Sequence, residues 1–315
     1  MLGRFGISMY FCGMNPETYH IPVLLTPSVE GLAIRPEGTY VDVTLGGGGH
    51  SREILKHLDG GGQLFSFDQD ADAISRVEDD PRWTPIHSNF RYLKNWMRYY
   101  GVEAIDGLLA DLGVSSHHFD TPQRGFSFRS EAPLDMRMNQ QAQLTAADVL
   151  NTYTREQLTS IFRLYGELRQ AGRISSAITK VRSEAPIETT SQLAELLIPL
   201  LGHDHERKDL ARAFQALRIE VNGEMSALEE MLTSAIELLR PGGRLVVISY
   251  HSLEDRIVKN MMRAGNINGE VESDLYGRTK APMRAVDKAI TPTPEEMETN
   301  PRSRSARLRI AEKIG

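Results

Sequence analysis

The sequence predicts an α/β protein with a doubly wound, mostly parallel sheet and an inserted helical domain. Short apolar runs, typical of strands buried on both faces, alternate with segments of helical periodicity. A long helical stretch then separates the third run from the fourth. The four runs cover residues 40–44, 63–68, 105–111 and 244–250.

The spacing of these runs places the insertion. The segment 51–58 carries Ile54, Leu55 and Leu58 on one helical face, as a crossover helix between neighbouring parallel strands should. The fourth run begins about 130 residues after Asp111, far more than one crossover needs.

Helical signals fill this gap. Thr154 and Gln157 form a capping-box pattern, and apolar residues recur at helical spacing over 174–181 and 194–201. We therefore expect residues 131–214 to form a helical substrate-recognition domain that is inserted into a discontinuous sheet domain, residues 14–130 and 215–315. Residues 1–13 are expected to be a leader without a folded role.

Composition excludes several classes of protein. The chain has 315 residues and no apolar run near the ~18 residues that a membrane-spanning helix needs. The single cysteine, Cys12, excludes an internal disulfide framework, a cysteine zinc site and an iron–sulfur cluster, and it fits a reducing cytoplasm. A net charge of −6 excludes a uniformly basic surface but allows a local basic patch.

Four consecutive glycines, residues 46–49, follow the first strand and precede the first helix. Such a turn lets a ligand touch the backbone. A nucleoside triphosphate would need a lysine after the glycines, and a dinucleotide would need a third glycine where Ser51 stands. S-adenosylmethionine, which carries no phosphate, is the remaining candidate.

Asp68 supplies the acid that an adenosine ribose needs. It ends the second strand, 22 residues after Gly46, close to the ~20-residue spacing of a ribose-binding carboxylate. The alternative role for Asp68 is the N-cap of a helix that starts near Asp72.

Histidines occur in two small groups, His117 with His118 and His203 with His205. Neighbouring histidines point in different directions, and zinc needs three or four ligands. We therefore predict no metal site.

Eight stretches, in order, resemble the bacterial small-subunit ribosomal RNA cytosine-N4-methyltransferases, and they cover nearly everything after Met14. The stretches are HIPVLL (20–25), GGGGHS (46–51), DLGVSS (111–116), RGFSF (124–128), PLDMRM (133–138), FQALRI (214–219), HSLEDR (251–256) and NPRSRS (300–305).

The resemblance implies a class I, Rossmann-like methyltransferase that takes S-adenosyl-L-methionine and methylates the N4 amine of a cytidine in 16S ribosomal RNA. It implies ribosomal RNA, within a small-subunit particle, as the partner, and neither membrane nor metal. The implied cofactor contacts are Gly48, Gly49, His50, Asp68, Phe90, Asp111 and His118. His118 stands where the family has a glutamine, and Phe90 would serve equally as ordinary core.

Asp111 is also the predicted catalytic residue. The cytosine amine is a poor nucleophile and needs an acceptor for its proton, and Asp111 lies at a strand's carboxyl end, where such sheets place ligands. Tyr250 ends the fourth strand and should face the same crevice. Ser252 and Asp255 are predicted to cap the helix that follows.

Three alternatives stay open at this point. The same fold could methylate a small molecule or a protein, the chain could be a nicotinamide-dependent oxidoreductase, or it could bind RNA without catalysis.

The last forty residues, 276–315, carry nine basic and five acidic residues. Leu308 and Ile310 alternate with arginines, as on a strand with one buried face. We expect this segment to form a sheet edge that presents Arg302 and Arg304 to the RNA backbone, with the inserted helices as the other possible RNA site.

Overall fold

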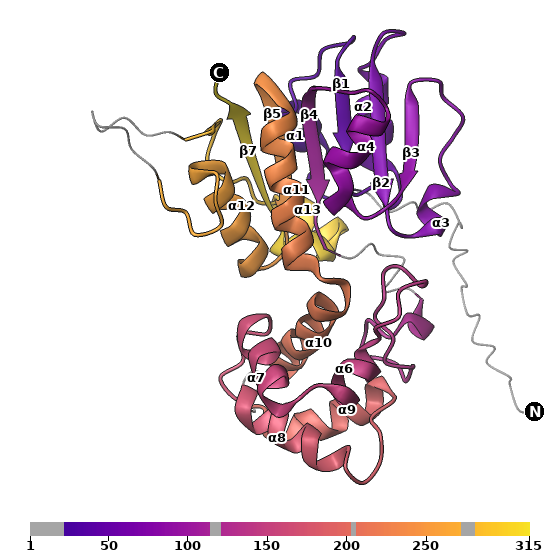
Figure 1. Ribbon diagram of the computed structural model, residues 1–315, viewed down its shortest axis with the longest axis vertical. Coiled ribbons are helices and arrows are strands. Elements are labelled where there is room, and N and C mark those ends of the chain that lie inside the picture. Colours follow the sequence, from indigo (N-terminus) through magenta and orange to yellow (C-terminus); the bar gives the residue numbers. More distant parts are fainter. Residues whose placement is uncertain (1–21, 114–120, 203–205, 272–280) are drawn as a thin grey trace, which may run out of the picture.

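The computed structural model describes residues 22–113, 121–202, 206–271 and 281–315. A seven-stranded sheet of order β3-β2-β1-β4-β5-β7-β6 forms the upper part of the molecule (Figure 1). β1 to β5 pair in parallel, and β7 runs antiparallel to β5 and β6. The predicted doubly wound, mostly parallel sheet is confirmed. The strands are β1 (Thr39–Asp42), β2 (Gln63–Asp68), β3 (Trp83–His87), β4 (Ile105–Asp111), β5 (Leu239–Ser249), β6 (Met283–Ala285) and β7 (Arg307–Lys313).

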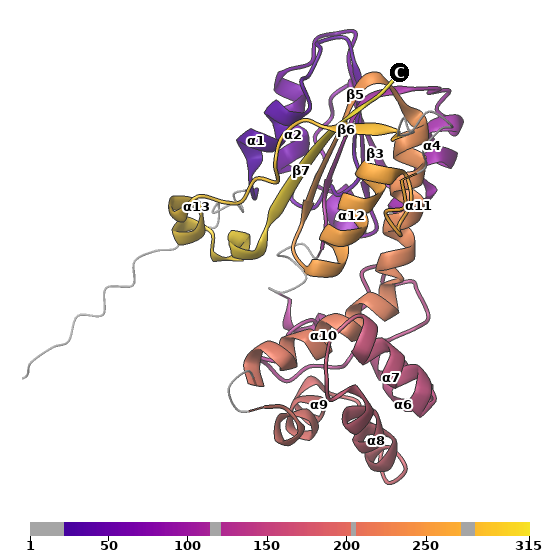
Figure 2. The same cartoon turned by 90° about the vertical axis from the view of Figure 1, so that its left-hand side faces the viewer.

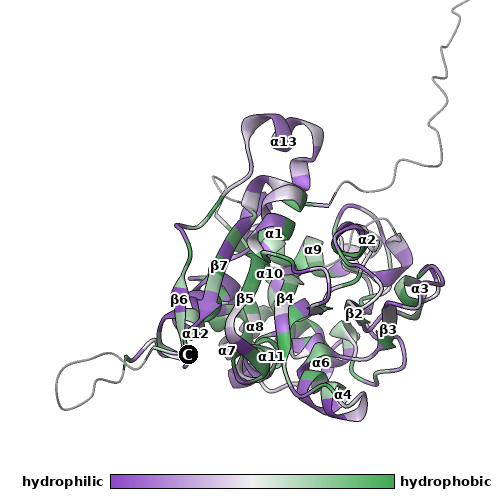
Figure 3. Ribbon diagram, turned by 90° about the horizontal axis from the view of Figure 1, so that it is seen from above, coloured by the Kyte–Doolittle hydropathy of each residue, from purple (hydrophilic) through white to green (hydrophobic). Residues whose placement is uncertain are grey.

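Helices cover both faces of the sheet because successive strand side chains point to opposite sides. Seen from above, α1 and α2 lie on one side and α4, α11 and α12 on the other (Figure 3). Each face has its own apolar core, with Val41 and Leu108 in one and Tyr40 and Leu109 in the other. The helices around the sheet are α1 (Leu25–Gly31), α2 (Gly49–Lys56), α3 (Ala71–Ile74), α4 (Leu93–Tyr99), α11 (Glu224–Leu238), α12 (Ser252–Ala264) and α13 (Pro294–Thr299).

All four strands predicted from apolar runs are present, as β1, β2, β4 and β5. β3 was not predicted. Its sequence, Trp-Thr-Pro-Ile-His, contains a proline, which only an edge strand readily accepts, and β3 is an edge of the sheet.

The predicted C-terminal strand is confirmed, and the segment 276–315 forms one edge of the sheet, with β6 as the edge strand. β7 lies between β5 and β6. Arg307 and Arg309 are held by the Asp255 carboxylate, at 3.1 Å and 2.7 Å, and so do not extend freely into solvent. Arg302 and Arg304 are exposed in the 3-10 turn η5 (Pro301–Ser305) that precedes β7.

A second group of helices lies below the sheet (Figures 1 and 2). It has its own apolar core, which includes Leu158, Phe162, Ile174 and Leu217. We call this group the helical cluster. It consists of α6 (Ala146–Thr152), α7 (Arg155–Leu164), α8 (Ala171–Val181), α9 (Thr190–Leu197), the 3-10 turn η3 (Ile198–Leu200) and α10 (Glu206–Asn222).

The helices predicted from apolar spacing in the sequence are present in the cluster. The predicted capping box is formed before α7, where the Thr154 hydroxyl accepts from the Gln157 amide at 3.2 Å and Gln157 Oε1 accepts from the Thr154 amide at 2.7 Å. α10 continues through residue 214 to Asn222, and Gly223, at φ 58°, separates it from α11. None of the described helices has both the length and the apolar character needed to cross a membrane.

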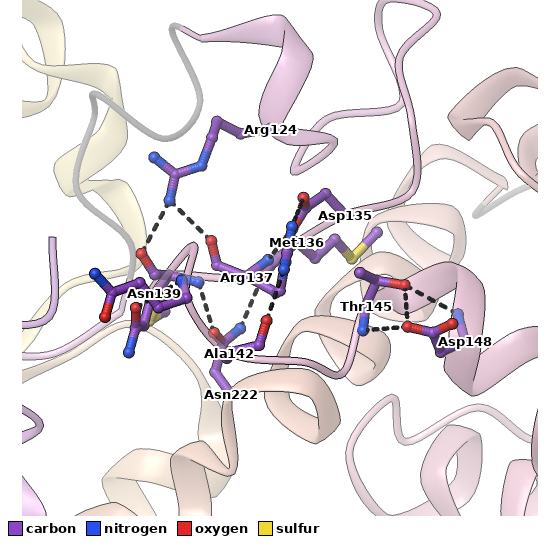
Figure 4. A network of polar contacts seen from close by, with 11 residues as sticks. Arg124, Asp135, Met136, Arg137, Asn139, Ala142, Thr145, Asp148 and Asn222 are labelled. Atoms are coloured by element: carbon purple, nitrogen blue, oxygen red, sulfur yellow. Dashed lines mark hydrogen bonds and ion pairs between the residues drawn. The ribbon is translucent and has the colours of Figure 1, made fainter.

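The chain between β4 and α6 is fixed by a polar network (Figure 4). Asp135 and Arg137 form a two-bond ion pair at 2.7 and 2.8 Å. Asn222, at the end of α10, accepts from the Met138 amide at 2.7 Å and donates to the Met136 carbonyl at 2.8 Å. The PLDMRM stretch therefore joins the incoming chain to the helix that leads back to the sheet.

Asn222 provides a test of this junction. In Asn222→Ala the Met138 amide and the Met136 carbonyl lose their partner. We expect the free energy of unfolding to fall by ~1–3 kcal/mol, the usual cost of leaving such groups unpaired. Thermal or urea unfolding measures this. Asn95→Ala, on an exposed face of α4, is the control and should change stability by no more than ~0.5 kcal/mol. Equal stability of the two variants would show that the network does not hold the junction.

Candidate active site

The carboxyl ends of β1 and β4 mark the topological switch point of the sheet. The order β3-β2-β1-β4-β5 means that the connections leave β1 and β4 in opposite directions. Open α/β sheets bind ligands at this point. Asp42, Asp68 and Asp111, the last residues of β1, β2 and β4, all lie at this end of the sheet.

The glycine loop connects β1 to α2 in a turn that side chains would obstruct. Gly48 has φ 77°, a left-handed conformation that L residues rarely adopt. A Cβ on Gly49 would lie 2.1 Å from Pro22 Cγ, so the chain at Pro22 closes over the loop. Gly47, in contrast, is exposed and has nothing within 4 Å of its added Cβ. The loop is therefore packed from one side and open at Gly47.

The buried Asp42 carboxylate organises this loop. It accepts from the Thr44 amide at 3.0 Å and from the Ser51 hydroxyl, on α2, at 2.6 Å. The Thr44 hydroxyl accepts in turn from the Asp111 amide at 2.6 Å. Asp42 and Thr44 were not predicted as site residues. The Thr44 hydroxyl ties the end of β1 to the end of β4.

Asp68 lies beside the loop and does not cap a helix. Its carboxylate accepts from the Gly46 amide at 2.8 Å and from the Asp70 amide at 2.9 Å. The N-cap of α3 is Asp70, whose side chain accepts from the Asp72 amide, so the alternative role for Asp68 is wrong. Each carboxylate oxygen has a second lone pair, and the half-buried Asp68 can still accept from a pair of hydroxyls.

Asp111 is contacted by two further side chains. The Tyr250 hydroxyl donates to Asp111 Oδ1 at 2.7 Å, and His50 Nδ1 lies 3.9 Å from Oδ2. The Asp111 side chain is 24% exposed, yet it lies deep enough in the crevice that loss of hydration raises its pKa to about 6, against the lowering effects of His50 and Tyr250. Near neutral pH this carboxylate is mostly ionised and can accept a proton.

Tyr250 is partly buried and packs against the same carboxylate. Burial, and then the neighbouring Asp111 charge, raise the pKa of its phenol well above the ordinary value. The phenol therefore remains a hydrogen-bond donor. The sequence placed Tyr250 in the crevice without indicating this bond, since the two residues are 139 positions apart.

The N-terminal cap of α12 is not formed by Ser252 and Asp255, as was predicted. The N-cap is His251, whose Nδ1 accepts from the Glu254 amide, and Glu254 is the acid at the third helical position. Ser252 instead donates to Glu167 of the helical cluster at 2.8 Å. A histidine ring reaching its own helix is a less common cap than serine, so the pattern Ser-x-x-Asp was the stronger signal in the sequence.

The remaining predicted contacts lie around this crevice or outside the described residues. His50 is buried on α2, where Nε2 lies 3.2 Å from the Val23 carbonyl oxygen. Phe90 is partly buried and packs against the core that covers one face of the sheet. His118, His117, His203 and His205 lie outside the described residues. Among the residues that are described, no three His, Cys, Asp or Glu side chains gather as metal ligands would.

The residues present fit an adenosine without phosphates. A carboxylate at the end of β2 suits ribose hydroxyls, the glycine loop is open at Gly47, and a second acid, Asp111, borders the crevice. The loop has no lysine after its glycines, as a triphosphate would require.

Comparisons with known proteins agree with this arrangement. A family model described as the MraW methylase family matches residues 17–314. A protein of Parabacteroides distasonis named "Ribosomal RNA small subunit methyltransferase H" is 60% identical over 298 residues, 94% of this chain and 98% of that protein. Proteins of the same name from Bacteroides thetaiotaomicron and Cytophaga hutchinsonii are 59% and 56% identical, each over 94% of this chain and 98% and 99% of their own lengths. The chain therefore belongs to the MraW methylase family and is an S-adenosyl-L-methionine-dependent methyltransferase.

Proposed function

We propose that this enzyme methylates the N4 amine of a cytidine in 16S ribosomal RNA, within a small-subunit particle in the cytoplasm. The observation that carries the proposal is the ionisable Asp111 at the switch point, held by Tyr250 and beside His50. Family membership, together with relatives named for small-subunit ribosomal RNA, favours this activity over methyl transfer to a small molecule or protein and over a nicotinamide-dependent reaction.

We propose that Gly48, Gly49, His50, Asp68, Phe90, Asp111 and His118 contact the cofactor. S-adenosylmethionine supplies a methyl group that its sulfonium charge already activates, so the protein has mainly to orient the nucleophile. Asp68 binds the ribose hydroxyls, and the glycine loop supplies a surface that a ligand can approach closely.

Asp111 is the proposed proton acceptor. The lone pair of the cytosine amine is drawn into the ring, so a carboxylate that accepts a hydrogen bond from the amine makes it more nucleophilic. Tyr250 orients this carboxylate by donating to Oδ1. Oδ2 faces His50 at 3.9 Å and keeps lone-pair capacity for the amine, directly or through a water.

The helical cluster is the proposed substrate-recognition domain. It has a core separate from those of the sheet and meets the crevice through the Glu167–Ser252 contact. The domain limits proposed from the sequence, 131–214 between 14–130 and 215–315, divide α10, so we place the second boundary at Gly223, where α10 ends. That Arg302 and Arg304 contact RNA stays a prediction.

One experiment tests the function directly. The enzyme is incubated with labelled S-adenosylmethionine and either free 16S RNA or small-subunit particles, and the RNA is digested to nucleosides. We expect label in N4-methylcytidine. Label in another nucleoside, or in protein, would refute the proposed reaction, and the two RNA forms identify the preferred substrate.

Cofactor binding tests Asp68. In Asp68→Ala the ribose loses a charged acceptor, and we expect S-adenosylmethionine affinity to fall by ~1.5–3 kcal/mol, the range for hydrogen bonds to charged groups. Calorimetry measures this. Asp79→Ala, an exposed acid beyond α3, is the control and should bind normally. Normal binding by Asp68→Ala would remove this residue from the cofactor site.

Turnover tests Asp111. Asp111→Asn keeps the size of the side chain but is a poor proton acceptor, so kcat should fall by ~10²-fold or more. Cofactor affinity is measured on the same variant. A loss of affinity with normal kcat at saturating cofactor would assign Asp111 to binding alone.

The pH profile tests the Tyr250–Asp111 bond. Because Asp111 has a pKa of about 6, kcat/KM should rise with pH and level off above that value. The Tyr250 hydroxyl stabilises the ionised carboxylate, so Tyr250→Phe should raise the pKa of Asp111 and move the acid limb to higher pH. Tyr99→Phe, an exposed tyrosine on α4, should leave the profile in place. An unmoved limb in Tyr250→Phe would show that another group controls it.

A further inference from the structure

A cavity of about 710 Å³ opens on the helical cluster, between α7, α8 and η3. Arginines dominate its lining, and none of the described residues that line it is acidic. The lining residues are Arg155, Arg163, Arg169, Gln170, Gly172, Arg173, Ser176 and Leu200.

These four arginines differ from most others in the described part of the chain. Arg52, Arg82, Arg91, Arg137 and Arg218, among others, are paired with acids at 2.7–2.9 Å. Within the described residues, the guanidinium groups of the four cavity arginines have neither an ion pair nor a hydrogen bond, and all four side chains are exposed. Four unneutralised charges around one hollow repel each other, and an anion there relieves that repulsion.

The backbone adds to the positive potential. α8 begins at the cavity, with Gln170 as its N-cap and Gly172 and Arg173 in its first turn. No side chain caps this helix, and its first turn contains no acid. The positive end of the α8 dipole and the arginines therefore favour the same kind of ligand.

The segment that borders the cavity contacts the helix that follows Tyr250. Arg169 and Glu167 belong to the segment between α7 and α8. Glu167 accepts from Ser252 at 2.8 Å and from Arg256 at 3.2 Å, at the start of α12. Ser252 is two residues after Tyr250, whose hydroxyl contacts Asp111. Glu167 also has φ 49°, a left-handed conformation that non-glycine residues rarely adopt. This unusual backbone conformation occurs at the residue that contacts α12.

We propose that this arginine cavity binds phosphodiester groups of the RNA chain that flank the target cytidine. The inference rests on the proposed RNA substrate. Guanidinium groups suit phosphate because they can donate two parallel hydrogen bonds to it, and the described lining residues include no acid that would repel a polyanion. Phosphate contacts of this kind fix the register of the RNA, and the base is selected by contacts at the active site.

The test combines one double variant with one matched control. Arg163→Gln/Arg173→Gln removes one guanidinium from α7 and one from α8. Arg98→Gln/Lys259→Gln removes the same charge from exposed positions on α4 and α12. RNA binding is measured for both and for the wild type over a range of salt concentrations, together with S-adenosylmethionine binding and thermal unfolding.

We expect the cavity variant to lose about tenfold or more in RNA affinity. The slope of log affinity against log salt should flatten by roughly 1.4, at ~0.7 per single-strand phosphate. Cofactor affinity and melting temperature should match the wild type. In methyl transfer, KM for RNA should rise while kcat at saturating RNA is kept, because the cavity lining includes none of the residues proposed to contact the reacting atoms.

Two results would overturn the proposal while the enzyme still methylates RNA. One is wild-type RNA affinity and salt slope in the cavity variant. The other is an equal loss in the control variant, which would mean that net charge alone matters. A wild-type enzyme that neither binds nor methylates RNA would instead overturn the proposed function itself, and the cavity proposal with it.

Discussion

The buried carboxylate of Asp42 is the constraint on which the active-site geometry depends. A buried carboxylate must have its lone pairs satisfied, and Asp42 takes its donors from Thr44 and Ser51. Through the Ser51 hydroxyl, 2.8 Å from that of Ser66, the network reaches β2. Ser66 also accepts from Trp83 Nε1 on β3, at 2.7 Å. One acid at the end of β1 thus fixes the start of α2 and is linked through Ser51 and Ser66 to β2 and β3.

Thr44 extends this network to Asp111. Its hydroxyl accepts from the Asp111 amide and so fixes the last residue of β4 against the loop that follows β1. The side chain of Asp111 is oriented separately, by Tyr250 at the end of β5. The ends of β1, β4 and β5 therefore act together to position the Asp111 carboxylate. Its raised pKa follows from the same packing, because the groups that position it also exclude water.

Most of the sheet could be predicted because β1, β2, β4 and β5 are local apolar runs buried on both faces. The glycine loop and Asp68 could be recognised because their residue types and spacing carry the chemical requirement within one short segment. The Tyr250–Asp111 bond joins residues far apart in sequence, and no local pattern indicates it. β3 has too few apolar residues and a proline, and the position of β7 depends on β6, a three-residue strand that no periodicity reveals. The cap of α12 shows a further limit, since two plausible caps were adjacent and only the fold decides between them.

The contact between Glu296 and Leu24 has a consequence for biosynthesis. The Leu24 amide donates to Glu296 Oε1 at 2.7 Å, and next to it Pro22 packs on the glycine loop while the Val23 carbonyl lies by His50. The cover of the glycine loop is thus joined to a residue that lies 272 positions later in the chain. A nascent chain can form β1, the loop and α2 early, but this cover gains its partner only after α13 has emerged. A chain that lacks α13 would therefore leave the Leu24 amide without this acceptor, and the cover of the glycine loop is completed only once α13 has been synthesised.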